Sequence, residues 1–206
     1  KFSFKNKNEI NKAILNIKEK KFHITDISSK VINRNPSGPF TTSTLQQTAS
    51  SRLGFGASRT MQIAQKLYQG IEIDGETIGL ITYMRTDGTN LSKDAVSAFR
   101  DYIKGEIGNE YLPENSLNYS GKKAKNAQEA HEAIRPTDII RTPLSVKKYL
   151  SQDQNKLYDL IWSRALSSQM ESAKFDRNTI TISSDDNNTI CKASGSVLKF
   201  DGFLKV

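Results

Sequence analysis

Residues 80–92 read LITYMRTDGTNLS and hold a tyrosine, an arginine and an aspartate at alternating positions. In an extended segment side chains alternate between two faces, so Tyr83 and Arg85 are expected on one side, together with Ile81. The phenol and the guanidinium then lie roughly 7 Å apart along the chain, which lets both touch one phosphate. The stretch therefore predicts a nucleophilic tyrosine beside a phosphate-binding arginine.

The chemistry of such a tyrosine depends on its neighbours. A free tyrosine has a pKa near 10, so only about one molecule in a thousand is ionised at pH 7, and attack needs a proton acceptor or a nearby cation. Arg85 supplies the positive charge and can bind a phosphate with two parallel hydrogen bonds, while Asp87 could orient Arg85 or move a proton. The alternative is a half-buried strand tyrosine, a surface arginine and a turn at Asp87-Gly88.

The residues before this stretch predict two helices and a hairpin. Thr41, Thr42 and Ser43 can cap a helix that ends near Arg52, and a second helix is expected over residues 58–69. A pair of helices joined by a tight turn resembles a helix-turn-helix. Backbone N–H groups and hydroxyls at the start of the first helix are a ready phosphate site, with Thr42 as a candidate contact. Capping without any ligand is the alternative. Asp74-Gly75 then predicts a hairpin turn within residues 70–79.

A second polar cluster lies in residues 128–137, which read QEAHEAIRPT. On a helix stopped by the Arg-Pro step, Gln128, His131 and Arg135 would share one face. A protonated imidazole and a guanidinium both bind phosphate, so this face is a candidate nucleic-acid contact. The alternative is a helix end at which Arg135 pairs with carbonyl groups or with Glu132.

The rest of the chain predicts the fold class. Strands are expected over residues 22–32 and again from residue 175, with helices between them, including one over residues 153–173. We therefore predict an α+β, multidomain fold in which a helical domain is inserted into a β-rich one. The expected bounds are 1–37 and 171–206 for the β-rich arch domain and 38–170 for the helical domain.

Composition narrows the class of partner. The 206 residues carry 30 Lys plus Arg against 22 Asp plus Glu, a net charge of +8 that favours anionic partners such as nucleic acid. No apolar run approaches the roughly 20 residues that cross a bilayer, so we expect a soluble, intracellular protein without a membrane partner. The single Cys191 is expected to be a small buried residue, and its spacing to His23 and His131 gives no metal site. The chain, from Lys1 to Val206, is expected to be part of a larger protein.

Four motifs in order resemble the bacterial type IA DNA topoisomerases, and the resemblance extends over all 206 residues to the closing KFDGFLKV. The motifs are PFTTSTLQQ (39–47), RLGFGASRTM (52–61), GLITYMRTDGTNLS (79–92) and QEAHEAIRPT (128–137). The resemblance implies a central fragment of the enzyme, in which a helical domain bearing the tyrosine is inserted into a β-rich arch. Gly88 departs from the serine of many relatives, and the loop over residues 70–79 is longer than in some of them.

The resemblance also implies a mechanism. Tyr83 would attack a single DNA strand and join its 5′-phosphate, Arg85 would hold that phosphate, and His131 would contact DNA nearby. The whole enzyme would relax negatively supercoiled DNA at a single-stranded segment, without ATP, in the bacterial cytoplasm at the nucleoid. It would use Mg²⁺ bound by residues outside this chain, so the fragment alone is expected to be inactive. The expected DNA-binding residues are Arg85, Asp87, His131, Arg135, Gln128 and Thr42.

Two other functions stay open at this point. The first is a noncatalytic DNA-binding module that uses residues 41–69 as a helix-turn-helix. The second is an anionic-ligand or protein-interaction domain, which predicts no salt-sensitive affinity for single-stranded DNA.

Overall fold

A computed structural model describes residues 3–119 and 131–206. The chain forms two compact units: unit 1 comprises Lys1–Arg34 and Lys174–Phe200, and unit 2 comprises Asn35–Ala173 and Asp201–Val206. In sequence, the long segment of unit 2 is thus inserted between the two segments of unit 1, and its short segment follows them. Helices and antiparallel sheets alternate along the chain, which confirms the expected α+β class. Residues 201–206, expected with the return segment, lie in unit 2 because the backbone N–H of Phe203 donates to the Glu171 carbonyl.

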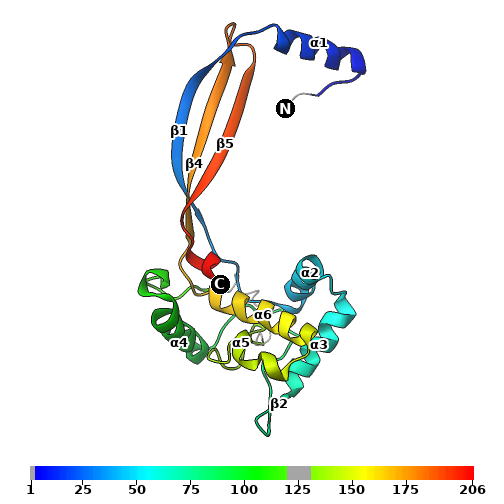
Figure 1. The fold of residues 1–206 in the computed structure, drawn as a ribbon, viewed down its shortest axis with the longest axis vertical. Helices are drawn as coiled ribbons and strands as arrows, with labels where there is room; N and C mark the ends of the chain where they lie inside the picture. The colour runs from blue at the N-terminus through cyan, green and yellow to red at the C-terminus, as the bar shows by residue number, and fades with distance from the viewer. Residues whose placement is uncertain (1–2, 120–130) are drawn as a thin grey trace, which may run out of the picture. The chain divides into compact units, whose positions relative to one another are not determined.

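Unit 1 is a helix and a three-stranded sheet (Figure 1). Its elements are α1 (Lys7–Lys18), β1 (Phe22–Arg34), β4 (Ala173–Ser184) and β5 (Ile190–Phe200). The strand order is β1-β4-β5, and β4 pairs antiparallel with β5 from Lys174↔Phe200 to Ser183↔Ile190. Strand β1 and the pair β4–β5 confirm the strands expected over residues 22–32 and from residue 175.

The sheet of unit 1 buries very few side chains. Among the residues of this unit that the structure describes, only Ser183 and Ser184 are buried. Cys191 lies on the edge strand β5 and is exposed, so the expectation of a buried cysteine is wrong. The physical reason is that residues 190–199 of this strand are exposed on both faces.

Unit 2 contains the hydrophobic core. Its helices and strands are α2 (Thr42–Leu53), α3 (Ala57–Gln69), β2 (Ile71–Ile73), β3 (Glu76–Ile78), α4 (Lys93–Tyr102), α5 (Pro143–Val146) and α6 (Gln152–Ser167), with a π turn at Ile103–Ile107 and 3₁₀ turns at Asn109–Tyr111, Lys147–Tyr149 and Gly202–Lys205. Helix α6 packs against α2, α3 and α5 (Figure 1). It ends at Ser167, earlier than expected, and a few residues later the Glu171 N–H donates to the Tyr111 carbonyl. No helix within residues 3–119 and 131–206 combines the length and apolarity needed to cross a membrane.

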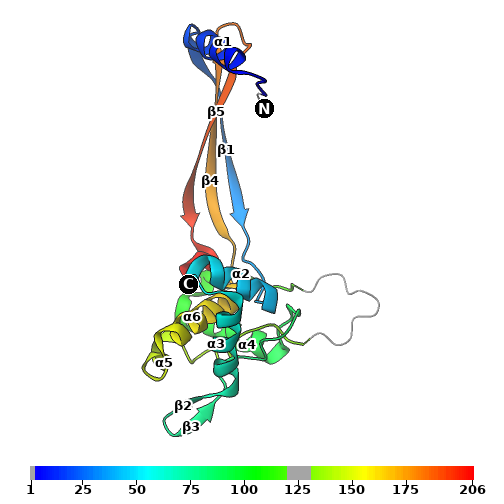
Figure 2. The same cartoon turned by 90° about the vertical axis from the view of Figure 1, so that its right-hand side faces the viewer.

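Glycines and a tight turn determine the backbone path that leads to residues 80–92. Gly54 ends α2 in the left-handed conformation (φ 68°), which confirms the expected break before α3. After α3, the β2–β3 hairpin turns at Asp74-Gly75, also as expected, and projects from the end of this helix (Figure 2). A side chain at Gly79 would lie 2.7 Å from the Tyr68 carbonyl oxygen, so glycine allows the chain to return against α3.

Candidate active site

Backbone hydrogen bonds join two sequence motifs that lie far apart in the chain. We call residues 80–92 the tyrosine segment and residues 131–137 the histidine segment. The Thr82 N–H donates to the Arg135 carbonyl oxygen (2.9 Å), and the Arg135 N–H donates to the Thr82 hydroxyl (3.0 Å). The tyrosine segment is therefore held beside the histidine segment.

The histidine segment is not helical where the structure describes it. Residues 131–133 form neither helix nor strand, and Ile134 forms an isolated β-bridge with Phe40. The expected helix is wrong because the backbone N–H groups bond to distant carbonyls: that of Ile134 to Phe40 and that of Ala133 to Asn90, both at 2.9 Å. Gln128 lies outside the described residues.

Side chains along the tyrosine segment alternate over its middle part. The exposed members are Tyr83, Arg85 and Asp87, and the intervening buried members are Met84 and Thr86. Ile81 does not share the exposed side as expected, because it forms a bridge with Pro136 and is 1% exposed. The three polar residues are therefore exposed, and the residues between them are buried, with the period of two that their spacing predicts.

Thr42 fixes the backbone on both sides of Arg85. Its hydroxyl lies 2.8 Å from the Met84 carbonyl oxygen and 3.0 Å from that of Thr86, and it accepts from the Thr86 N–H at 2.8 Å. A hydroxyl has one proton to donate, so these partners already occupy it. We therefore expect Thr42 to position Arg85, and not to contact DNA through its side chain.

The ring of Tyr83 lies between two aromatic neighbours. It meets Tyr68 of α3 at a centroid distance of 5.3 Å and His131 at 6.1 Å, both with edge-to-face geometry. The side chain is 41% exposed, and among residues 3–119 and 131–206 its hydroxyl has no hydrogen-bond partner. The ring is thus oriented by its two aromatic neighbours, and none of the described residues holds the phenol oxygen. Sequence reasoning missed Tyr68, because no local pattern links it to Tyr83 across the intervening hairpin.

His131, which contacts this ring, also lines a hollow of about 310 Å³. Its lining residues are Thr41, Thr42, Ser43, Arg85, Thr86, Asp87 and His131. The guanidinium of Arg85 and the imidazole of His131 border it together with the N-terminus of α2, whose backbone carries a partial positive charge. The hollow therefore combines the groups that bind a phosphate, with the Asp87 carboxylate on its rim.

Gly88 permits the close approach of the two segments. A Cβ built at this position would lie 1.9 Å from the His131 carbonyl oxygen, which is far inside any allowed contact. The Thr86 hydroxyl donates to the same carbonyl at 3.2 Å. In this chain the glycine therefore lets the His131 backbone rest directly on the tyrosine segment.

Arg135 does not line the hollow but turns toward Glu132. Its Nε and Nη2 donate to the two carboxylate oxygens at 2.7 and 2.9 Å, and Nη1 donates to the Pro136 carbonyl oxygen at 2.8 Å. The side chain is 14% exposed. The expectation that Arg135 shares a helical stripe with His131 is wrong, and the pairing with Glu132 that was its alternative is present.

Glu132 also receives the backbone N–H of Ser92, the N-cap residue of α4, at 2.7 Å. Burial by itself raises the pKa of this carboxyl, but the hydrogen bonds from Arg135 and Ser92 outweigh it and hold the pKa below its usual value. The carboxylate thus joins the histidine segment to the start of α4.

This lowered pKa predicts a pH-dependent stability. Because the folded state favours the ionised carboxylate, the contribution is complete above the ordinary pKa of 4.5 and is lost as the pH falls through the lowered value. Thermal unfolding of the 206-residue chain and of Glu132→Gln, followed from about pH 7 to about pH 3, should give two midpoints that converge on acidification. A constant difference between the two midpoints would contradict the prediction.

The described residues do not fit a metal site. Within residues 3–119 and 131–206, no group of three or more His, Cys, Asp or Glu side chains could hold a metal ion. Asp87 and His131 line the hollow without a third such ligand.

The whole chain is similar in sequence and in fold to known proteins. A family model described as DNA topoisomerase matches residues 1–206. The DNA topoisomerase 1 of Rickettsia typhi is 50% identical over all 206 residues, which cover 26% of that protein, and that of Haemophilus influenzae is 47% identical over the same residues, which cover 22%. The full-length topoisomerase I of Thermotoga maritima matches with a TM-score of 0.82 and 37% identity, covering 100% of this chain and 32% of that one. The chain therefore spans about a quarter of the length of the curated relatives.

Proposed function

This chain belongs to the bacterial type IA DNA topoisomerase family, and on that premise we propose that the protein containing it breaks and rejoins one DNA strand through Tyr83. The observation that carries the proposal is the exposed Tyr83 ring, whose hydroxyl has no partner among the described residues. The ring lies edge-on to His131, which lines a hollow together with Arg85.

The proposed step is a phosphoryl transfer. The Tyr83 oxygen attacks the phosphorus of a DNA phosphodiester, a bond forms between them, and the bond from phosphorus to the 3′-oxygen breaks. The phenol gives up its proton and the departing 3′-oxygen takes one up. The product is a 5′-phosphotyrosine, and the reverse reaction restores the DNA. Because one phosphoester bond is exchanged for another at each step, the cycle needs no ATP.

Three polar side chains support this step in the proposal. Arg85 binds the nonbridging oxygens of the phosphate and offsets the negative charge that develops on them. His131 donates a further hydrogen bond from a ring N–H, and the N-terminus of α2 adds its partial positive charge. Asp87, on the same rim, orients Arg85 or accepts the phenol proton.

We further propose that Mg²⁺ assists the whole protein from ligands outside this chain, since the described residues offer no suitable cluster. It would supply positive charge near the phosphate. The physiological substrate in this proposal is a single-stranded segment of negatively supercoiled DNA at the nucleoid, through which a second strand passes before rejoining.

The test is to map a covalent adduct. The full-length protein would be incubated with Mg²⁺ and a labelled single-stranded oligonucleotide, denatured and digested, and the nucleotide-bearing peptide sequenced by mass spectrometry. We expect the label on Tyr83, and we expect the 206-residue chain alone to leave supercoiled DNA unrelaxed. Salt-sensitive DNA binding without any adduct would favour the noncatalytic DNA-binding module. Relaxation by the isolated chain would overturn the requirement for the rest of the protein.

A further inference from the structure

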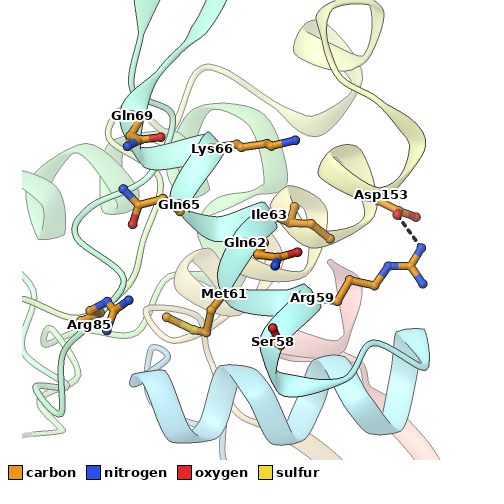
Figure 3. Close-up of a pocket in the computed structure, with 10 residues that line it drawn as sticks. All are labelled: Ser58, Arg59, Met61, Gln62, Ile63, Gln65, Lys66, Gln69, Arg85 and Asp153. Atoms are coloured by element: carbon orange, nitrogen blue, oxygen red, sulfur yellow. Dashed lines mark hydrogen bonds and ion pairs between the residues drawn. The ribbon is translucent and has the colours of Figure 1, made fainter.

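The outer face of α3 bears a polar stripe (Figure 3). Ser58, Gln62, Gln65 and Gln69 follow at i, i+4, i+7 and i+11 and so lie along one side of the helix. An open hollow of about 810 Å³ covers this face. Its lining residues are Ser58, Arg59, Met61, Gln62, Ile63, Gln65, Lys66, Gln69, Arg85 and Asp153.

Cations flank the stripe on both sides. Arg59 and Lys66 lie on one side of α3, and Arg85 lies on the other beside Met61 (Figure 3). Arg85 also lines the hollow next to His131, so the two hollows meet at this residue. A DNA strand whose phosphate sits at Arg85 can therefore continue along α3.

The chemistry of this face suits one strand of nucleic acid. The glutamine amides donate and accept hydrogen bonds and can meet base edges of any sequence, while the cations suit phosphates. From Ser58 to Gln69 the helix extends about 16 Å at 1.5 Å per residue. Stacked nucleotides of one strand are spaced by about 3.4 Å, so the face has room for several of them.

The position of α3 indicates which part of the strand it holds. Tyr83 lies in the same compact unit as α3 and contacts Tyr68 on it. After cleavage, the DNA that remains with this unit is the piece bonded through its 5′-phosphate to Tyr83. The other piece, with the free 3′-hydroxyl, has to part from Tyr83 for a strand to pass.

We propose that the outer face of α3 binds the nucleotides that follow the scissile phosphate on the covalently held strand. The proposal rests on the proposed function, since it takes Tyr83 as the point of attachment. Its consequence is that the broken end is held along α3 as well as through one covalent bond, which keeps it aligned for rejoining.

Asp153 gives the proposal a second, opposite prediction. Its carboxylate pairs with the Arg59 guanidinium at 2.5 Å, and both residues line the hollow. There the carboxylate repels a phosphate and neutralises the charge of Arg59. Lys66 has no ion-pair partner within the described residues. Asp153→Asn should therefore strengthen DNA binding, whereas Lys66→Gln should weaken it.

The experiment uses the full-length protein and two oligonucleotides that share one cleavage position. The long one extends about eight nucleotides beyond it on the 5′-phosphate side, and the short one about two. We expect Lys66→Gln to raise the Kd of the long oligonucleotide roughly fivefold and to lower its salt slope by about 0.7, with little change for the short one. Asp153→Asn should lower the Kd of the long oligonucleotide. Lys104→Gln, an exposed lysine of unit 2 outside the hollow, is the matched control.

The possible outcomes distinguish a failure of this proposal from a failure of the proposed function. Equal effects of Lys66→Gln on both oligonucleotides, or no effect on either, would overturn the binding role of α3. Weakened binding by Asp153→Asn would also overturn it. Adduct formation on Tyr83 is measured in the same samples, so its absence would refute the proposed function, whereas its presence without a length effect refutes only the role of α3.

Discussion

Replacing Tyr83 with phenylalanine in the full-length protein is expected to abolish the covalent DNA adduct while most noncovalent affinity remains. The substitution removes the attacking oxygen and nothing else, because the ring can keep its edge contacts with Tyr68 and His131. Since the hydroxyl has no partner within residues 3–119 and 131–206, its loss should leave the folded state about as stable as before. Denaturing electrophoresis of a labelled oligonucleotide measures the adduct, and equilibrium titration measures the affinity.

Tyr68→Phe is the matched control for this experiment. It removes a hydroxyl from the neighbouring ring and keeps the aromatic contact, so the adduct should persist. An adduct that survives Tyr83→Phe would assign the nucleophile to another residue. Loss of both binding and thermal stability would instead indicate that the hydroxyl has a structural role.

Short-range signals were sufficient for much of the fold. The break between α2 and α3 follows from Gly54, which adopts a positive φ at low cost, and the β2–β3 turn follows from Asp74-Gly75 for the same reason. The alternation of exposed Tyr83 and Arg85 with buried Met84 likewise follows the period of two that the sequence predicts. These features depend on a few consecutive residues, so the sequence alone predicts them.

The errors arise where distant residues compete for the backbone. The helical pattern of residues 128–134 is locally sound, but the N–H of Ile134 bonds to Phe40, nearly a hundred positions earlier in the chain. Thr42, a predicted DNA contact, also has a role that its sequence position does not show, because its hydroxyl lies between the Met84 and Thr86 backbones. Tertiary hydrogen bonds of this kind leave no periodic trace in the sequence.

Replacing Arg135 with alanine is expected to destabilise unit 2 and to leave the salt dependence of DNA binding unchanged. The substitution leaves the largely buried Glu132 carboxylate without its cationic partner. This carboxylate also accepts a hydrogen bond from the N–H of Ser92, the N-cap of α4. Breaking one side of such a pair should cost about 2–3 kcal/mol, below the fully buried range because Glu132 keeps some solvent contact. For a chain of this length the midpoint of thermal unfolding should fall by roughly 5–10 °C.

Arg85→Ala is expected to have the opposite effects on stability and DNA binding. The two variants together distinguish an arginine that stabilises the fold from one that binds DNA. The Arg85 side chain is exposed and lines both hollows, so its loss should weaken DNA binding and lower the salt slope with little change in unfolding. The double variant Glu132→Gln/Arg135→Met removes both charges of the pair and should be more stable than Arg135→Ala, because no unpaired carboxylate remains. If Arg135→Ala instead lowered the salt slope at an unchanged unfolding midpoint, Arg135 would contact DNA directly, and its pairing with Glu132 would have to open when DNA binds.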